Sequence, residues 1–266
     1  MSFFGANFIF NEIPSENYGV QIISFERTSG TNKSSSGNTV IINQKWPYRR
    51  TSPYHFGNSQ NTPLEFDFEI GANNFVSFID ISKISKWLLG QSTYKKFQIV
   101  QDDLGEVFWN IIFTNSETVF VGNKPVGMVL HAVCDAPWAH TFDQTFSYSF
   151  PVVAAQYFDF TFFNSSDNNG YLYPTIEFTL NSLGSDFTLT NTTDDGREFI
   201  FTGLSASEGI TVDNSLQTIS STTGLYRLSY FNKNWFRFCP GLNELHITSA
   251  ISFVEFTYSF ARTVGG

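Results

Sequence analysis

The sequence predicts a mainly β protein with one α-helix. Three observations lead to this fold class. Apolar and polar residues alternate with a period of two along many short segments, turn-forming residues separate these segments, and Phe, Tyr and Trp make up 18% of the 266 residues. With 31 Phe and 41% hydrophobic residues, the chain has ample material for buried cores, so wholesale disorder is excluded.

Four segments show the strand period most clearly. In residues 64–70, one Leu, two Phe and one Ile fall on one face of a strand, and the three acidic residues between them fall on the other face. The same alternation recurs in residues 157–162, 176–180 and 254–260. A helix over these segments would place carboxylates in the core, so we predict strands that each bury one face.

Short turns join three pairs of predicted strands into hairpins. The turns are Asp103-Leu104-Gly105, Asp194-Asp195-Gly196 and Asp213-Asn214, whose residue types favour tight reversals of the chain. The paired segments are residues 97–101 with 107–114, 187–190 with 198–201, and 209–212 with 216–219.

One segment, residues 80–90, follows the helical period instead. Its apolar residues form a single stripe, made of Ile81, Ile84, Trp87 and Leu88. Asp80 or Ser82 is expected to cap the start of this helix, and Gly90 is expected to close its end. A single short helix in a strand-rich chain usually covers the open end or side of a sheet.

The charge distribution indicates two domains. Residues 1–138 carry 10 basic and 12 acidic side chains, for a net charge of -2, whereas residues 139–266 carry 5 and 12, for a net charge of -7. The composition changes near residues 137–143, where a predicted strand ends in a Pro-Trp pair. We therefore expect a domain boundary between residues 138 and 139.

Several classes of protein do not fit this composition. A net charge of -9 and an isoelectric point near 4.8 argue against sequence-specific nucleic-acid binding, which needs clustered Lys and Arg. The apolar runs are too short for membrane insertion, and the N-terminus lacks the features of a secretion signal. Two Cys residues are too few for a disulfide framework, so we expect synthesis in a reducing cytoplasm.

No constellation of residues predicts catalysis, cofactor binding or a metal site. The four His residues have no metal-ligand spacing, and no nucleophile or phosphate-binding motif is present. The acidic pairs Asp102-Asp103 and Asp194-Asp195 fall in turn positions, where Asp bonds its own backbone. Residues 165–170 resemble a calcium loop but lack its leading Asp and its closing Glu. We therefore predict a binding or structural protein and not an enzyme.

Two alternative functions stay open at this stage. A carbohydrate-binding protein of the lectin type would need an exposed aromatic ring beside polar side chains, and Trp235 with Arg227, Arg237 and Asn243 is the candidate group; packing of Trp235 in a core is favoured over it. A β-sandwich glycoside hydrolase would need two carboxylates about 5 to 9.5 Å apart in a cleft.

Three stretches of the chain together carry a resemblance to a known protein family. The first is residues 8–20, an apolar segment followed by a turn and a polar-aromatic-glycine step. The second is the Trp-Leu-Leu-Gly end of the predicted helix, followed by residues 133–139 with their Pro-Trp pair. The third is residues 235–247 around Pro240-Gly241-Leu242-Asn243, with residues 253–262 as the final strand. These stretches cover nearly the whole chain, and their order and spacing resemble the distal tail protein family of phages with long, non-contractile tails.

This resemblance implies a specific architecture and a set of partners. Residues 1–138 would form a ring-forming β-sandwich or split-barrel-like domain with one helix, and residues 139–266 a galectin-like β-sandwich that points outward. Six copies would form a ring, single or as two stacked rings, between the tail tube protein and the tail-associated hub protein at the distal end of the virion tail. The outward domains would dock receptor-binding or other baseplate proteins, and DNA would pass through the lumen. Some relatives carry an inserted carbohydrate-binding domain, for which this chain has no room.

Residues 46–56 are the predicted contact between neighbouring subunits. They are aromatic, irregular and partly basic, which makes a poor free surface and a good interface anchor. The interface residues expected here are Trp46, Tyr48, Arg49, Arg50, Tyr54 and Phe56.

Overall fold

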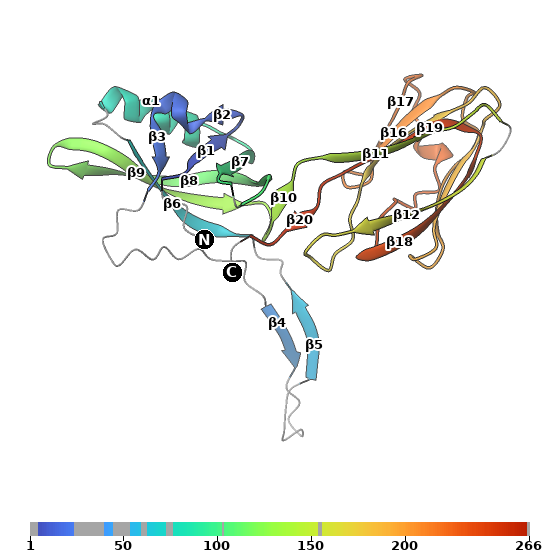
Figure 1. The fold of residues 1–266 in the computed structure, drawn as a ribbon, viewed down its shortest axis with the longest axis horizontal. Helices are drawn as coiled ribbons and strands as arrows, with labels where there is room; N and C mark the ends of the chain where they lie inside the picture. Colours follow the sequence, from blue (N-terminus) through green and yellow to red (C-terminus); the bar gives the residue numbers. More distant parts are fainter. Residues whose placement is uncertain are drawn as a thin grey trace. The chain divides into compact units, whose positions relative to one another are not determined.

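The computed structural model describes residues 5–23, 40–44, 54–59, 63–72, 77–102, 104–153 and 156–264. Within these ranges the chain is mainly β with one α-helix, as the sequence predicts (Figure 1). It divides into two compact units, the first made of residues 1–140 with 262–266 and the second of Thr141–Ala261. Each unit has a hydrophobic core of its own.

The first unit is built on one antiparallel sheet with the strand order β2-β1-β7-β8-β9-β6-β3. Strand β10 (Ala139–Thr141) pairs with β8 and with β20 (Ala261–Arg262), and the 3-10 helix η1 spans Ser15–Tyr18. The main strands are β1 (Asn7–Phe10), β2 (Ile13–Pro14), β3 (Val20–Ile22), β6 (Glu65–Ala72), β7 (Lys95–Val100), β8 (Val107–Val121) and β9 (Lys124–Cys134). In β6 the predicted alternation is confirmed, because Phe68 and Ile70 are buried while Glu65 and Asp67 are exposed.

Helix α1 (Phe78–Leu89) covers one face of this sheet over β8 and β9 (Figure 1). Its predicted apolar stripe is confirmed, since the four residues of that stripe are its buried ones. Trp87 anchors the helix: its indole stacks on Phe8 and Tyr18, and its Nε1–H donates to the Phe10 carbonyl at 3.2 Å. Gly90 closes the helix, because its N–H donates to the carbonyl of Lys86.

The predicted start of the helix was wrong by one turn. Neither Asp80 nor Ser82 is the N-cap; Ser77 is, and its hydroxyl accepts a hydrogen bond from the Asp80 N–H at 3.2 Å. The Asp80 carboxylate in turn accepts a hydrogen bond from the Ser77 backbone N–H, which completes a capping box. The hydrogen bond from Ser77 and the nearby Lys83 lower the pKa of Asp80.

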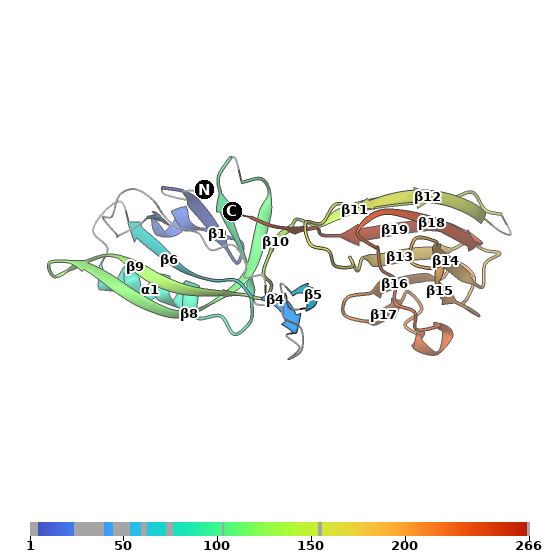
Figure 2. The same cartoon turned by 90° about the horizontal axis from the view of Figure 1, so that it is seen from below.

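Strands β8 and β9 form a hairpin longer than the sequence indicates. The predicted strand ends at Thr114, whereas β8 continues to Val121, through polar residues that suggest a turn in the sequence. The register with β9 shifts between Phe113 and Asn115, so the ladder passes a bulge and then continues. The end of the hairpin extends past the neighbouring strands of the sheet (Figures 1 and 2).

A separate two-stranded antiparallel sheet pairs β4 (Val40–Gln44) with β5 (Tyr54–Ser59). Its register shifts between Ile41 and Asn43.

The second unit is a sandwich of two antiparallel sheets (Figure 1). One sheet has the order β11-β19-β13-β16-β17 and the other β12-β18-β14-β15. The strands are β11 (Gln144–Ser149), β12 (Gln156–Asn164), β13 (Thr175–Leu180), β14 (Phe187–Asn191), β15 (Arg197–Phe201), β16 (Gly209–Asp213), β17 (Thr218–Ser221), β18 (Gly241–Ser249) and β19 (Ile251–Tyr258), with a 3-10 helix η2 at Leu228–Tyr230.

Phenylalanine rings join the two sheets of the sandwich. Phe178 of β13 stacks on Phe187 of β14 with the ring centroids 3.9 Å apart, and Phe160 of β12 lies 5.7 Å from Phe256 of β19. The predicted hairpins β7–β8, β14–β15 and β16–β17 are all confirmed by their strand pairing. The Phe-rich composition therefore serves two cores filled by the inward positions of alternating strands.

Candidate functional site

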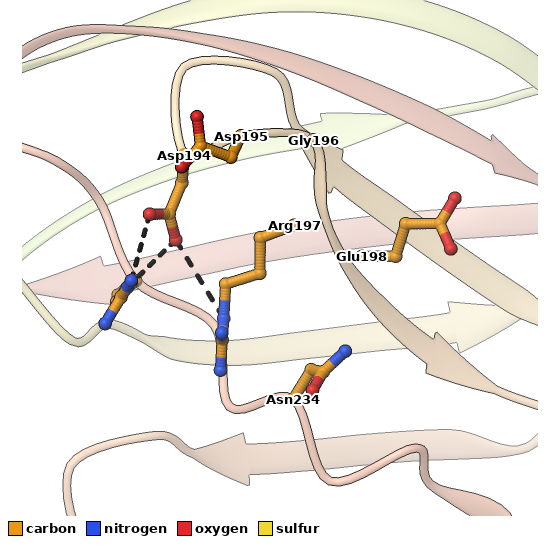
Figure 3. Close-up of a pocket in the computed structure, with 7 residues that line it drawn as sticks. Asp194, Asp195, Gly196, Arg197, Glu198 and Asn234 are labelled. Carbon is orange, nitrogen blue, oxygen red and sulfur yellow. Dashed lines mark hydrogen bonds and ion pairs between the residues drawn. The ribbon is translucent and has the colours of Figure 1, made fainter.

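A polar pocket of about 400 Å³ lies at the turn between β14 and β15 in the second unit (Figure 3). The turn forms because Asp195 and Gly196 both have positive φ, at 53° and 69°, as a tight reversal between paired strands requires. The residues that line the pocket are Asp194, Asp195, Gly196, Arg197, Glu198, Asn234 and Arg237.

Asp194 and Arg237 form the fixed centre of this pocket. The guanidinium of Arg237 donates to both carboxylate oxygens of Asp194, at 2.9 and 3.0 Å, and Arg197 lies 3.9 Å from the same carboxylate. The flat face of the Arg237 guanidinium stacks on the ring of Tyr171, with Cζ of Arg237 3.7 Å from the ring centroid. This arrangement lowers the pKa of Asp194 and raises the pKa of Arg237, chiefly through the hydrogen bonds between them.

The pocket is suited to hydrogen bonding and poorly suited to acid–base chemistry. Asp194 stays ionised and is occupied by Arg237, so it makes a poor general acid or base. Glu198 points away from Asp194, so the two carboxylates do not converge on one point (Figure 3). Arg197 is held by a hydrogen bond from its Nε to the Trp235 carbonyl at 3.1 Å. No group of three or more metal-ligating side chains occurs in the described part of the chain.

The candidate sugar-binding group around Trp235 is not brought together. The Arg227 side chain is buried in an ion pair with Glu208 at 2.7 Å, and Asn243 is fully buried and hydrogen-bonded to the backbone of Cys239. Trp235 packs against the core beside Phe231, with the ring centroids 4.9 Å apart. Among the four proposed residues, Arg237 alone lines the pocket.

Two of the four His residues lie in cross-strand acidic pairs. Nδ1 of His131 in β9 lies 2.9 Å from Oδ1 of Asp67 in β6. Nδ1 of His246 in β18 lies 2.5 Å from Oδ1 of Asp159 in β12. His140 is half-buried and stacks on Phe108, and burial lowers the pKa of its imidazole.

The two Cys residues differ in exposure. Cys134 is fully buried, and burial raises the pKa of its thiol to about 12. Cys239 is half-buried, and burial also raises the pKa of its thiol. Neither thiol is therefore activated as a nucleophile.

The predicted subunit contact falls largely outside the described residues. Trp46, Tyr48, Arg49 and Arg50 lie there, while Tyr54 and Phe56 belong to strand β5, of which the backbone alone is described. That interface stays a prediction.

The first unit carries an exposed apolar patch that the periodicity of the sequence does not predict. It consists of Phe78 and Ile79 at the start of α1 with Phe120 and Val121 at the end of β8, and their exposed fractions run from 47% to 69%. The rings of Phe78 and Phe120 lie 6.0 Å apart, so both segments contribute to one surface. One sequence feature could have indicated this patch. Phe78 and Ile79 come directly before the predicted helix, and neither belongs to the apolar stripe that the helix buries.

The fold and these surfaces define the class of protein: a two-unit β protein with a polar surface pocket and an exposed apolar patch. Family models then identify it. A phage tail protein N-terminal domain matches residues 3–136, and a phage tail C-terminal domain matches residues 138–258. The chain therefore belongs to this family of phage tail proteins.

Solved structures share the fold at low sequence identity. The Dit protein of phage SPP1, described as a hub of the adsorption apparatus in phages that infect Gram-positive bacteria, matches with a TM-score of 0.70 and 11% identity, over 96% of this chain and 99% of that one. A chain of the phage p2 baseplate matches with a TM-score of 0.55 and 9% identity, over 96% and 97% of the two chains. Comparison with curated protein sequences finds no match. The resemblance is thus confirmed for a family of phage tail proteins, and the fold is shared with the SPP1 Dit protein.

Proposed function

We propose that this chain is a hub protein at the distal end of a long, non-contractile phage tail, where six copies form a ring. The ring joins the tail tube protein to the tail-associated hub protein, and it assembles either singly or as two stacked rings. Membership in the phage tail family and the fold shared with the SPP1 Dit protein support this proposal. The role is structural and not enzymatic.

The apolar patch at the start of α1 and the end of β8 is the observation that carries the proposal. Large apolar side chains in water cost free energy, and a cluster of them marks a contact surface. Phe78, Ile79, Phe120 and Val121 contribute such a cluster on two neighbouring segments. In a closed ring each subunit presents one patch to a different patch of its neighbour, so this cluster would supply one of the two surfaces that such a contact requires.

The remaining features fit the same role. A net charge of -9 disfavours adhesion of DNA to a ring through which DNA passes, because like charges repel. The second unit, as an independent sandwich, offers docking sites for receptor-binding or other baseplate proteins. Residues 46–56, with their aromatic and basic side chains, add a second proposed contact between subunits.

The test is the solution mass of the full chain and of two variants. Wild type should give about six protomers of 30.1 kDa, or about twelve for paired rings. Phe120→Asp combined with Val121→Asp places two charges in the patch and should shift the mass to smaller species. Leu216→Asp, at an apolar residue of the second unit that is even more exposed, should leave the mass unchanged. A monomeric wild type, or a ring that survives the double variant, would overturn the assignment.

A further inference from the structure

The outer face of the four-stranded sheet in the second unit carries an ordered set of polar side chains. Strands β12, β18, β14 and β15 bury one set of alternating residues in the sandwich core and turn the other set to solvent. The strand register aligns these outward residues in two rows across the sheet. The first row is Tyr157, Thr248, Thr188 and Ile200, and the second is Asp159, His246, Thr190 and Glu198.

A chain of hydrogen bonds fixes the centre of this face. Oδ1 of Asp159 lies 2.5 Å from Nδ1 of His246, and Nε2 of the same imidazole lies 2.8 Å from Oγ1 of Thr248. Both ring nitrogens are therefore held, whichever of them carries the proton. Side chains that are fixed before binding lose little conformational entropy when a ligand arrives, so this group is preorganised to donate and accept hydrogen bonds.

The aromatic ring of Tyr157 lies beside this hydrogen-bonded group. Tyr157 is directly opposite Thr248 in the register, and its ring centroid lies 6.4 Å from that of His246. The side chain is 76% exposed, so most of the ring is open to solvent. A flat, exposed ring next to fixed hydrogen-bonding groups suits a ligand with both an apolar face and hydroxyl groups.

Charge narrows the chemistry of this ligand. Asp159, Glu198 and the neighbouring Glu244 are exposed carboxylates on the outer face, and no Lys or Arg is among the described outward residues of these four strands. Phosphates, nucleic acids and acidic polymers are therefore repelled. We propose that this face binds a neutral saccharide, with one pyranose ring stacked on Tyr157 and its hydroxyls bonded to Asp159, His246 and Thr248. This site differs in every residue from the group that the sequence suggested around Trp235.

Ligand-observed saturation-transfer NMR on the full chain tests this inference. The probes are methyl glucoside, methyl galactoside and N-acetylglucosamine, each at millimolar concentration, with glucuronate as the anionic comparison. Wild type should transfer saturation to the ring protons of at least one neutral sugar and less to glucuronate. Tyr157→Ala and His246→Ala should each weaken that binding at least about tenfold, which corresponds to about 1.4 kcal/mol.

Tyr226→Ala is the matched control, because Tyr226 is also 76% exposed and lies in the same unit but outside the outer face. Its binding should equal that of wild type. No transfer to any of the three sugars, equal binding by Tyr157→Ala and wild type, or preferred binding of glucuronate would overturn the inference. The solution mass of these variants should stay that of wild type, so the result does not depend on ring formation.

Discussion

At the scale of single residues, Glu208 is the most constrained charged group of the second unit. It is 1% exposed and accepts hydrogen bonds from the Arg227 guanidinium at 2.8 and 2.7 Å, from the hydroxyls of Ser221 and Thr223, and from the backbone N–H of Ser205. A buried carboxylate is tolerated because these donors replace the water that it loses.

Glu208→Gln should destabilise the protein. The amide leaves the buried Arg227 without its counter-ion, and breaking a buried ion pair of this kind costs about 3 to 5 kcal/mol. Chemical denaturation, with the midpoint of the second unit followed separately, measures the loss. Glu177→Gln is the matched control, because Glu177 is exposed on β13 and its change should cost less than about 0.5 kcal/mol.

The same residue predicts how stability depends on pH. Burial alone would raise the pKa of Glu208, but hydrogen bonds from Arg227, Ser221 and Ser205 outweigh it and lower the pKa from 4.5 to about 2. The unfolded chain binds this proton more readily, so the contribution of Glu208 is complete above about pH 4.5 and is lost as the pH falls toward 2. Unfolding curves of wild type should show this loss, and Glu208→Gln should lack that component; identical pH profiles would contradict the assignment.

The sequence predicted which side chains are buried, but it did not predict which side chains contact each other. Alternation placed Phe178 and Phe256 inside, because the period of a strand is a local property. The polar partners Asp194 and Arg237, and likewise Asp159 and His246, are 43 and 87 residues apart, and the sheet topology alone brings them together. Residue types therefore indicated turns and strands but gave no signal for these pairs.

At the scale of elements, two substitutions test which residue is the N-cap of helix α1. Ser77→Ala removes the side chain that caps the Asp80 N–H and should cost about 1 kcal/mol. Ser82→Ala, at an exposed position inside the helix, should be neutral or slightly stabilising because Ala has the higher helix propensity. Thermal unfolding of the two variants distinguishes them, and a larger loss for Ser82→Ala would contradict the capping box.

Helices and strands were predicted best where one continuous segment contained the whole hydrophobic or turn pattern. The stripe of α1 and the three hairpins needed no distant partner, and all of them are present. The helix start was misplaced because exposed apolar residues, Phe78 and Ile79, follow the true cap where polar ones are usual. The full length of β8 was missed because Asn115 and Ser116 resemble a turn, whereas pairing with β9 carries the strand through them.

At the scale of the whole molecule, the family was recognisable from the order of three weak motifs along the chain. Each motif alone is ordinary turn or helix chemistry, and the family models assign the chain to phage tail proteins. The contacts between subunits depend on surfaces that a single chain does not reveal by periodicity, which is why the apolar patch was missed.

Residues 46–56 are the second segment that we predict to contact a neighbouring subunit. Trp46→Ala combined with Tyr48→Ala should shift the proposed ring toward smaller species in light scattering, because large aromatic side chains contribute most to protein interfaces. Tyr226→Ala, an exposed aromatic of the second unit, should leave the mass unchanged. An unaltered ring in the double variant would remove this segment from the interface.

The most direct measurement for the whole account is the mass of the purified full chain in solution at micromolar concentration. The account predicts a particle of about six 30.1 kDa protomers, or about twelve, that dissociates when Phe120 and Val121 are replaced by Asp. A stable 30.1 kDa monomer across the accessible concentration range would contradict it.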